Sequence, residues 1–258
     1  MLFFISCGKS QVKTKPSYIT FDFKGDSILV IAKNPVLGKS FLKIKNLKTQ
    51  KENYIDFVKP NTLTVLGFHK NEIDSLQILE NYKFTLYYGL SSIVKYDTLY
   101  NYSLPFLKGK RFKVLQGQNS KFTHKGDFSR YAIDFKMRIG ETICSIRDGI
   151  VVSVKEDSNK GGRSEKYKSD GNYIVIAHKD DTFSQYVHLK KDGVIVEKGD
   201  SVLKGQKIGY SGNTGQSTEP HLHFAVYKPT KNGLISIPII LDSIPSKKYK
   251  KGRYAINN

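Results

Sequence analysis

The chain has 258 residues, is 39% hydrophobic and carries a formal net charge of +19. This length is enough to bury a core in one or two domains, and the composition is that of a globular protein. The excess of lysine favours polyanions such as nucleic acid, anionic lipid or an acidic wall polymer. No nucleic-acid-binding motif accompanies the charge, so we do not expect nucleic-acid binding. Most of the charge is typical of a solvated basic face, and its densest group predicts a basic tail over residues 245–258.

Residues 1–14 resemble a bacterial lipoprotein signal followed by a polar tether. Cys7 follows the apolar run Leu2–Ile5 and a small residue, and polar residues come after it. The resemblance implies that Cys7 is lipidated and anchors the protein to a membrane of the cell envelope, facing the periplasm or the cell surface. The apolar run is short and lacks a preceding positive region, so we expect the true start upstream. The alternative is a chance apolar N-terminus with a free thiol.

Short alternating segments follow over residues 15–103. Ile19, Phe21 and Phe23 alternate with polar residues, and turn signals such as Lys24-Gly25-Asp26 separate the apolar runs. This spacing predicts an N-terminal β-sandwich-like domain. No later run is long enough to span a bilayer as a helix.

A second domain is predicted over residues 104–244, where glycine turns become frequent. Strands are expected at residues 150–154, 173–177, 183–188 and 221–226. The predicted class is therefore mainly β, with no long amphipathic helix.

Five of the six histidines fall in this second domain. His221 and His223 stand two residues apart in a predicted strand, so their imidazoles point to the same face. Such a pair indicates a metal site, a general base, or one of each. Asp134 lies within an apolar segment, where a carboxylate is costly unless it is paired or binds a metal. Two histidines and an aspartate suit a catalytic zinc ion, although no compact ligand motif is present.

Several short motifs are weak signals when taken singly, but the order in which they follow one another along the second domain is specific for one family. They are Tyr131-Ala132-Ile133-Asp134-Phe135, Gly140-Glu141-Thr142, Arg147-Asp148-Gly149-Ile150-Val151, Asn172–His178, Tyr186-Val187-His188-Leu189, Gly199-Asp200, Gly205-Gln206, Ile208-Gly209, Gly212–Gly215 and Pro220–Phe224. In this order they resemble the lysostaphin/LytM family of zinc metallopeptidases from about Gly109 to Tyr227. The resemblance implies an antiparallel β-sheet enzyme, with one zinc ion per chain, that hydrolyses peptide bonds in peptidoglycan stem peptides or cross-links by a zinc-activated water.

The resemblance also implies roles for single residues. Asp134 and His223 correspond to zinc ligands. His221 corresponds to the catalytic histidine that takes a proton from the water. His188 corresponds to the other active-site histidine, which polarises the water or holds the developing oxyanion.

The first histidine ligand departs from the family pattern. Most members place it four residues before the aspartate, where this chain has Arg130, which cannot release its proton to bind zinc. Some relatives carry a Ser-His-x-Gly version with longer spacing, so we expect His124 to be the ligand. If it is not, His124 is a surface histidine beside an incomplete site.

Two alternatives to the enzyme remain at this point. Some members of the family have lost ligands and bind and activate cell-wall amidases, which would make this chain a catalytically impaired regulator. Residues 199–209 also resemble a hairpin of biotinyl or lipoyl domains, but no attachment lysine is evident. Of the remaining histidines, His178 is expected to be structural, and His69 has no polar constellation near it.

Overall fold

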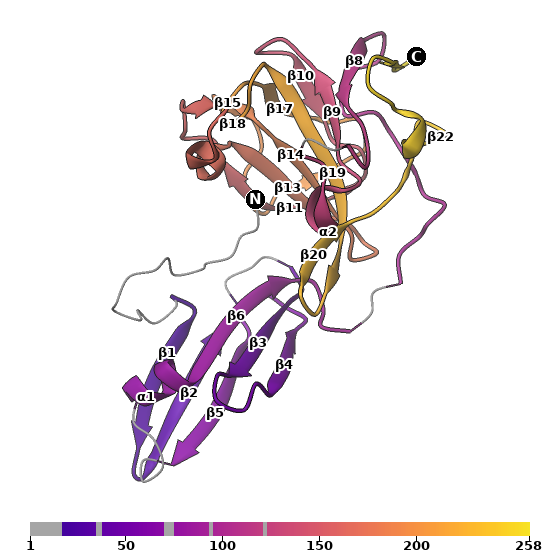
Figure 1. Cartoon of the computed structure of the whole chain (residues 1–258). Coiled ribbons are helices and arrows are strands. Elements are labelled where there is room, and N and C mark those ends of the chain that lie inside the picture. The colour runs from indigo at the N-terminus through magenta and orange to yellow at the C-terminus, as the bar shows by residue number, and fades with distance from the viewer. Residues whose placement is uncertain (1–16, 35–37, 70–74, 93–94, 121–122) are drawn as a thin grey trace. The chain divides into compact units, whose positions relative to one another are not determined.

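The computed structural model describes residues 17–34, 38–69, 75–92, 95–120 and 123–258 (Figure 1). These residues form two compact units. The N-terminal unit contains residues 17–92 together with 229–233, and the C-terminal unit contains residues 95–228 and 234–258. Cys7, with its predicted lipid, lies outside the described residues. Within the described ranges, no helix combines the length and the apolar character needed to cross a bilayer.

The N-terminal unit is built from two three-stranded antiparallel sheets with strand orders β1-β2-β5 and β4-β3-β6. Its elements are β1 (Ile19–Lys24), β2 (Ser27–Lys33), β3 (Ser40–Asn46), β4 (Glu52–Phe57), β5 (Leu63–His69), α1 (Ser75–Asn81) and β6 (Tyr82–Tyr88). Alternate residues of the strands point inward, so both sheets and α1 contribute to one core. That core contains Ile28 and Val30 from one sheet, Leu42 and Phe84 from the other, and Ile78 from the helix.

A nine-stranded sheet dominates the C-terminal unit. Its strands run in the order β16-β11-β13-β14-β19-β9-β8-β23, and β20 pairs with β19. Their bounds are β8 (Arg111–Gln116), β9 (Ile133–Lys136), β11 (Gly149–Lys155), β13 (Tyr173–Ala177), β14 (Phe183–Val187), β16 (Ser201–Val202), β19 (His221–Thr230), β20 (Gly233–Ser236) and β23 (Tyr254–Ile256). The central strands β13 and β14 are buried along almost their whole length, as expected for strands covered on both faces.

Smaller elements surround this sheet. Two three-stranded sheets have the orders β10-β17-β15 and β22-β21-β7, and β12 pairs with β18. Their bounds are β7 (Asn101–Tyr102), β10 (Thr142–Cys144), β12 (Gly161–Gly162), β15 (Leu189–Val194), β17 (Lys207–Ser211), β18 (Gly215–Gln216), β21 (Ile240–Leu241) and β22 (Ile244–Pro245). The helical elements are α2 (Gly126–Ser129) and the 3₁₀ segments η1 (Glu165–Asp170) and η2 (Ser246–Lys248). The structure thus confirms the predicted mainly β class.

The last residues of the chain belong to the fold. The sequence predicts a basic tail over residues 245–258, and the structure gives this segment η2 and β23. Strand β23 pairs with β8, so it forms one end of the nine-stranded sheet. Tyr249 is only 5% exposed and belongs to the core of the C-terminal unit. The lysines of this segment are therefore displayed from ordered backbone.

Candidate metal centre

Successive side chains of β9 and β19 point to opposite faces of the sheet, one toward the core and the next toward the candidate site. Leu222 and Phe224 of β19 are at most 1% exposed and pack in the core, which turns the intervening His223 to the opposite face. On the neighbouring strand β9, Ile133 and Phe135 are buried in the same core. Asp134 stands directly opposite His223 in the β9–β19 register. Because directly opposed residues share a face, the sheet itself brings this carboxylate and this imidazole together.

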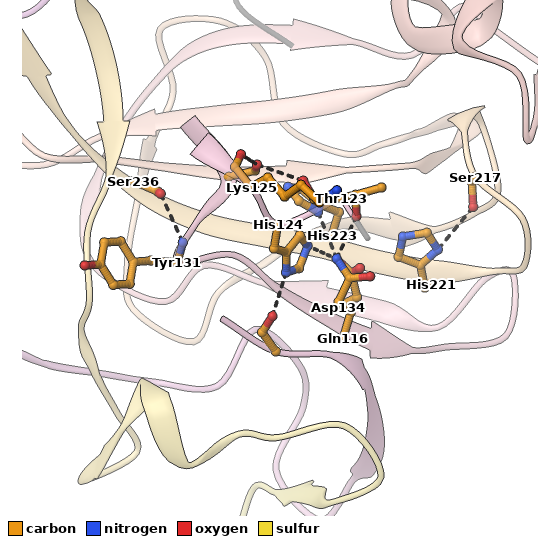
Figure 2. A network of polar contacts seen from close by, with 12 residues as sticks. Gln116, Thr123, His124, Lys125, Tyr131, Asp134, Ser217, His221, His223 and Ser236 are labelled. Carbon is orange, nitrogen blue, oxygen red and sulfur yellow. Dashed lines mark hydrogen bonds and ion pairs between the residues drawn. The ribbon is translucent and has the colours of Figure 1, made fainter. Parts of the chain in front are cut away.

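His124 reaches the same place from outside the sheet. It precedes the short helix α2, whose turn returns the chain to β9. Its ring is 1% exposed, and Nδ1 lies 2.9 Å from the carbonyl oxygen of Gly117. A carbonyl can only accept, so Nδ1 carries the proton and Nε2 presents a lone pair. His124 is thus ten residues from Asp134 in sequence but adjacent to it in space, as Figure 2 shows.

The three side chains converge through one nitrogen or oxygen atom each. Asp134 Oδ1 lies 2.8 Å from His223 Nδ1 and 3.3 Å from His124 Nε2. One candidate ligand atom from each of the three residues lies within 4.8 Å of the other two. Imidazole nitrogens and a carboxylate oxygen are the donors that zinc takes in catalytic sites with three protein ligands. The donor set therefore has the composition expected for a catalytic zinc ion.

The environment of His124 Nε2 tests whether a cation fits. This atom is buried, and the described residues offer it no hydrogen bond of acceptable geometry. With the proton on Nδ1, its lone pair faces the oxygen of Asp134 at 3.3 Å. Two electron-rich atoms repel at this separation unless a proton or a metal ion lies between them. The residues present therefore fit a zinc ion held by His124 Nε2, Asp134 Oδ1 and His223 Nδ1.

The pKa shifts of the three residues reflect their burial and their closeness to one another. Burial would raise the pKa of Asp134, but the adjacent imidazoles of His124 and His223 outweigh it and hold that pKa well below its usual value. Burial opposes protonation of His124, yet the adjacent carboxylate raises its pKa. For His223, burial dominates and lowers the pKa, against the opposing pull of Asp134. An ionised carboxylate beside imidazoles is the state that a metal ion requires.

His188 and His221 lie beside this cluster. Their ring centroids are 4.5 Å apart, and the His188 ring is 6.0 Å from that of His223. His221 Nδ1 lies 2.8 Å from the carbonyl oxygen of Glu219 and 3.1 Å from Ser217 Oγ, a contact drawn in Figure 2. The Glu219 carbonyl fixes the proton on Nδ1, which leaves Nε2 of His221 as the basic atom.

The backbone of His188 is in the left-handed region. Its φ is +68°, which a residue with a Cβ rarely adopts. Its Nδ1 donates to the carbonyl oxygen of Thr214 over 2.6 Å, so its Nε2 is also an acceptor. Burial, together with the charges of His221 and His223, lowers the pKa of His188 to about 3. Strain of this kind is retained where surrounding structure enforces it, and it clusters at functional sites.

Other residues singled out by the sequence lie elsewhere. Arg130 pairs with Asp127 over 3.4 Å, and its side chain is 46% exposed. His178 is buried, with Nδ1 2.8 Å from the Asp148 carbonyl oxygen and Nε2 3.0 Å from Ser184 Oγ. Both of its nitrogens are satisfied within the fold. The backbone of His69 ends β5 in the N-terminal unit.

Sequence reasoning does not identify the four groups that orient the site histidines. They are the carbonyls of Gly117, Thr214 and Glu219 and the hydroxyl of Ser217. Every residue has a carbonyl, so the three carbonyls leave no side-chain signal. The glycine at position 117 is an indirect signal, because a Cβ there would lie 2.4 Å from the carbonyl oxygen of Tyr249. A glycine is required where two backbones approach this closely.

Comparison with known proteins connects this site to a family. The model of peptidase family M23 matches residues 129–234. An "Uncharacterized metalloprotease" of Buchnera aphidicola is 35% identical over 197 residues, which cover 74% of this chain and 44% of that protein. The peptidoglycan DD-endopeptidase ShyA of Vibrio cholerae is 38% identical over 117 residues, 44% of this chain and 24% of ShyA. The chain thus spans less than half the length of these relatives.

Lysostaphin of Staphylococcus staphylolyticus is 44% identical over 95 residues, covering 36% of this chain and 18% of lysostaphin. The solved catalytic domain of lysostaphin from Staphylococcus simulans is 29% identical, covers 53% of this chain and 86% of that domain, and superposes with a TM-score of 0.34. The family match includes Asp134, His188, His221 and His223 and begins after His124. On the family model, residues 129–234 are a peptidase family M23 domain.

Proposed function

We propose that this protein is a zinc-dependent endopeptidase that hydrolyses peptide bonds in the stem peptides or cross-links of bacterial peptidoglycan. The observation that carries the proposal is the convergence of His124 Nε2, Asp134 Oδ1 and His223 Nδ1, with the buried His124 nitrogen lacking any hydrogen-bond partner among the described residues. The family match supports the peptidase activity. The activity of ShyA as a peptidoglycan DD-endopeptidase supports peptidoglycan as the substrate and the cell envelope as the place where this protein acts.

A bound zinc ion would act as a Lewis acid toward the scissile carbonyl and would lower the pKa of an attacking water. The protein's own groups supply the proton transfers. His221 donates Nδ1–H to the carbonyl of Glu219, so its Nε2 can take a proton from the water and return it to the leaving amine. The carbonyl and Ser217 Oγ would then hold the resulting imidazolium in place.

The resemblance gives His188 two possible roles, polarising the water or holding the developing oxyanion, and its hydrogen bond to Thr214 favours the first. Its Nδ1 proton is already donated, and its lowered pKa keeps Nε2 without a proton. An unprotonated nitrogen accepts a hydrogen bond but cannot donate one to an oxyanion. We therefore assign His188 to orienting and polarising the water.

The test compares His124→Ala with Arg130→Ala. Arg130 occupies the usual ligand position but pairs with Asp127 at the surface, so its loss should leave zinc and activity intact. The His124 variant should lose both. Zinc is measured by mass spectrometry of the purified protein, and hydrolysis by new amines and product masses from purified peptidoglycan. A wild-type protein without zinc and without hydrolysis would contradict the enzyme and favour the amidase-binding regulator. A His124 variant with full activity would contradict the proposed zinc site, because it would show that His124 is not a ligand the reaction needs.

A further inference from the structure

The basic segment near the C-terminus lines a cavity that the proposed peptidase activity does not use. The cavity has a volume of about 360 Å³. It is lined by Gly117, Gln118, Asn119, Ser120, Lys247, Tyr249, Lys250 and Lys251, and we call it the basic pocket. All eight residues belong to the C-terminal unit. None of them is a candidate metal ligand or a proposed catalytic residue.

Ordered contacts fix both walls of the basic pocket. On one wall, the Tyr249 hydroxyl donates to the carbonyl oxygen of Leu241 over 2.9 Å. On the other, the backbone N–H of Asn119 donates to the carbonyl oxygen of Arg130 over 2.8 Å. Gln118 Nε2 donates to Ser246 Oγ and so ties the two walls together. The lysines therefore surround a preformed hollow, which lowers the ordering cost of binding a ligand.

The charge of the basic pocket is not balanced locally. Lys247, Lys250 and Lys251 are all exposed, and within the described part of the chain none of them forms a salt bridge. No acidic residue lines the cavity. Like charges gathered around one hollow repel one another, so an anion placed among them is stabilised. Ammonium groups bind phosphate as point charges, without the fixed geometry that arginine imposes.

We propose that the basic pocket binds a phosphate group carried on a sugar or polyol. Three lysines match the charge of a phosphate monoester, about −1.5 to −2 at pH 7, better than the single charge of a carboxylate. A volume of about 360 Å³ exceeds what the phosphate alone requires and lies within the range of small-molecule sites, roughly 300–1,000 Å³. The remaining space accommodates the sugar or polyol that carries the phosphate. The exposed side-chain amide of Asn119 offers hydrogen-bond donors and an acceptor to its hydroxyl groups.

The basic pocket and the metal centre share one residue. Gly117 lines the pocket, and its carbonyl accepts the hydrogen bond from His124 Nδ1. A ligand in the basic pocket would thus lie next to the loop that holds a metal ligand. The binding itself does not depend on the peptidase activity.

The test is a titration of the ¹⁵N-labelled protein with inorganic phosphate and with glycerol 3-phosphate at constant ionic strength. Saturable shifts of the backbone amides of residues 117–120 are expected. The triple variant Lys247→Gln, Lys250→Gln, Lys251→Gln should bind at least tenfold more weakly. A matched triple variant, Lys168→Gln, Lys179→Gln, Lys190→Gln, removes the same charge from exposed lysines outside the pocket and should bind as the wild type does.

The triple variant Lys247→Arg, Lys250→Arg, Lys251→Arg keeps the charge and should preserve binding, which separates a lost site from a lost fold. Equal weakening in the two glutamine variants would overturn the proposal, because it would show general electrostatic attraction. Binding of acetate as tight as that of phosphate would also overturn it. So would binding to phosphatidylglycerol vesicles with no response to either small phosphate, which would identify a membrane-facing surface instead.

Discussion

Gly117→Ala tests the link between a backbone carbonyl and the metal centre. The added Cβ would lie 2.4 Å from the carbonyl oxygen of Tyr249, whereas ordinary contact begins at 3.4 Å. The two backbones must therefore separate by about 1.0 Å (3.4 − 2.4). No side-chain rotation can relieve the clash, because the nearest atoms on the other side are also backbone.

That displacement acts on the hydrogen bond that orients His124. The bond from His124 Nδ1 to the Gly117 carbonyl is 2.9 Å long, and a shift of this size stretches it beyond hydrogen-bonding distance or tilts the ring. Loss of such a supporting contact typically weakens metal binding by about 10–100-fold. We expect a weakening in this range for Gly117→Ala, measured by competition with a fluorescent zinc chelator.

The control is Gly67→Ala, where a Cβ meets nothing within 4 Å. Far-ultraviolet circular dichroism should confirm that both variants are folded before zinc is titrated. A folded Gly117→Ala protein that binds zinc as tightly as the wild type would refute the reasoning. So would an equal loss in Gly67→Ala.

Three further predictions concern other groups. His221→Ala should keep its zinc but lose activity by about 10²–10⁴-fold, because it removes a proton acceptor and no ligand; loss of zinc, measured by mass spectrometry, would place it among the ligands instead. Burial lowers the pKa of His178 from 6.5 to about 4. Between these two pH values the unfolded chain binds a proton on this histidine and the folded protein does not. The free energy of unfolding therefore falls by about 3 kcal/mol as the pH falls from 6.5 to 4. Urea unfolding with chelator present should show a smaller loss of stability between pH 7 and pH 4 for His178→Gln; an unchanged loss would contradict the buried neutral histidine. Cys7→Ala should move the full-length protein from the membrane to the soluble fraction of its bacterial host, and retention at the membrane would contradict lipidation at Cys7.

Strand patterns made much of the C-terminal unit predictable. Apolar residues flank Asp134 in its strand and His223 in its strand. The sequence therefore predicts that each of these two side chains points to the face of its own strand that is opposite its apolar neighbours. It does not state that β9 and β19 are neighbours, because strand pairing is a tertiary property. The family resemblance implied only that both residues are zinc ligands, and the structure shows them directly opposite each other on paired strands.

The parts that sequence reasoning could not reach are those set by loops and backbone. His124 was expected from a loose spacing, and only the fold brings its Nε2 to 3.3 Å from the carboxylate of Asp134. The carbonyls of Thr214 and Glu219, which orient His188 and His221, carry no residue-specific signal. The sequence predicts only a basic tail over residues 245–258, because charge alone does not reveal that Tyr249 anchors the lysines around a hollow.

The division of the ligands between sheet and loop bears on how an ion enters and leaves. Asp134 and His223 stand on paired strands of the large sheet, so their separation is set once the sheet has formed. His124 joins them from a segment outside the sheet, through contacts of its own. Asp134 and His223 therefore form a preformed pair of ligands that can bind the ion first, and His124 completes the site. The dissociation rate of the ion should depend on how firmly His124 is held. Substitutions around residues 117–124 should therefore change the dissociation rate more than the association rate.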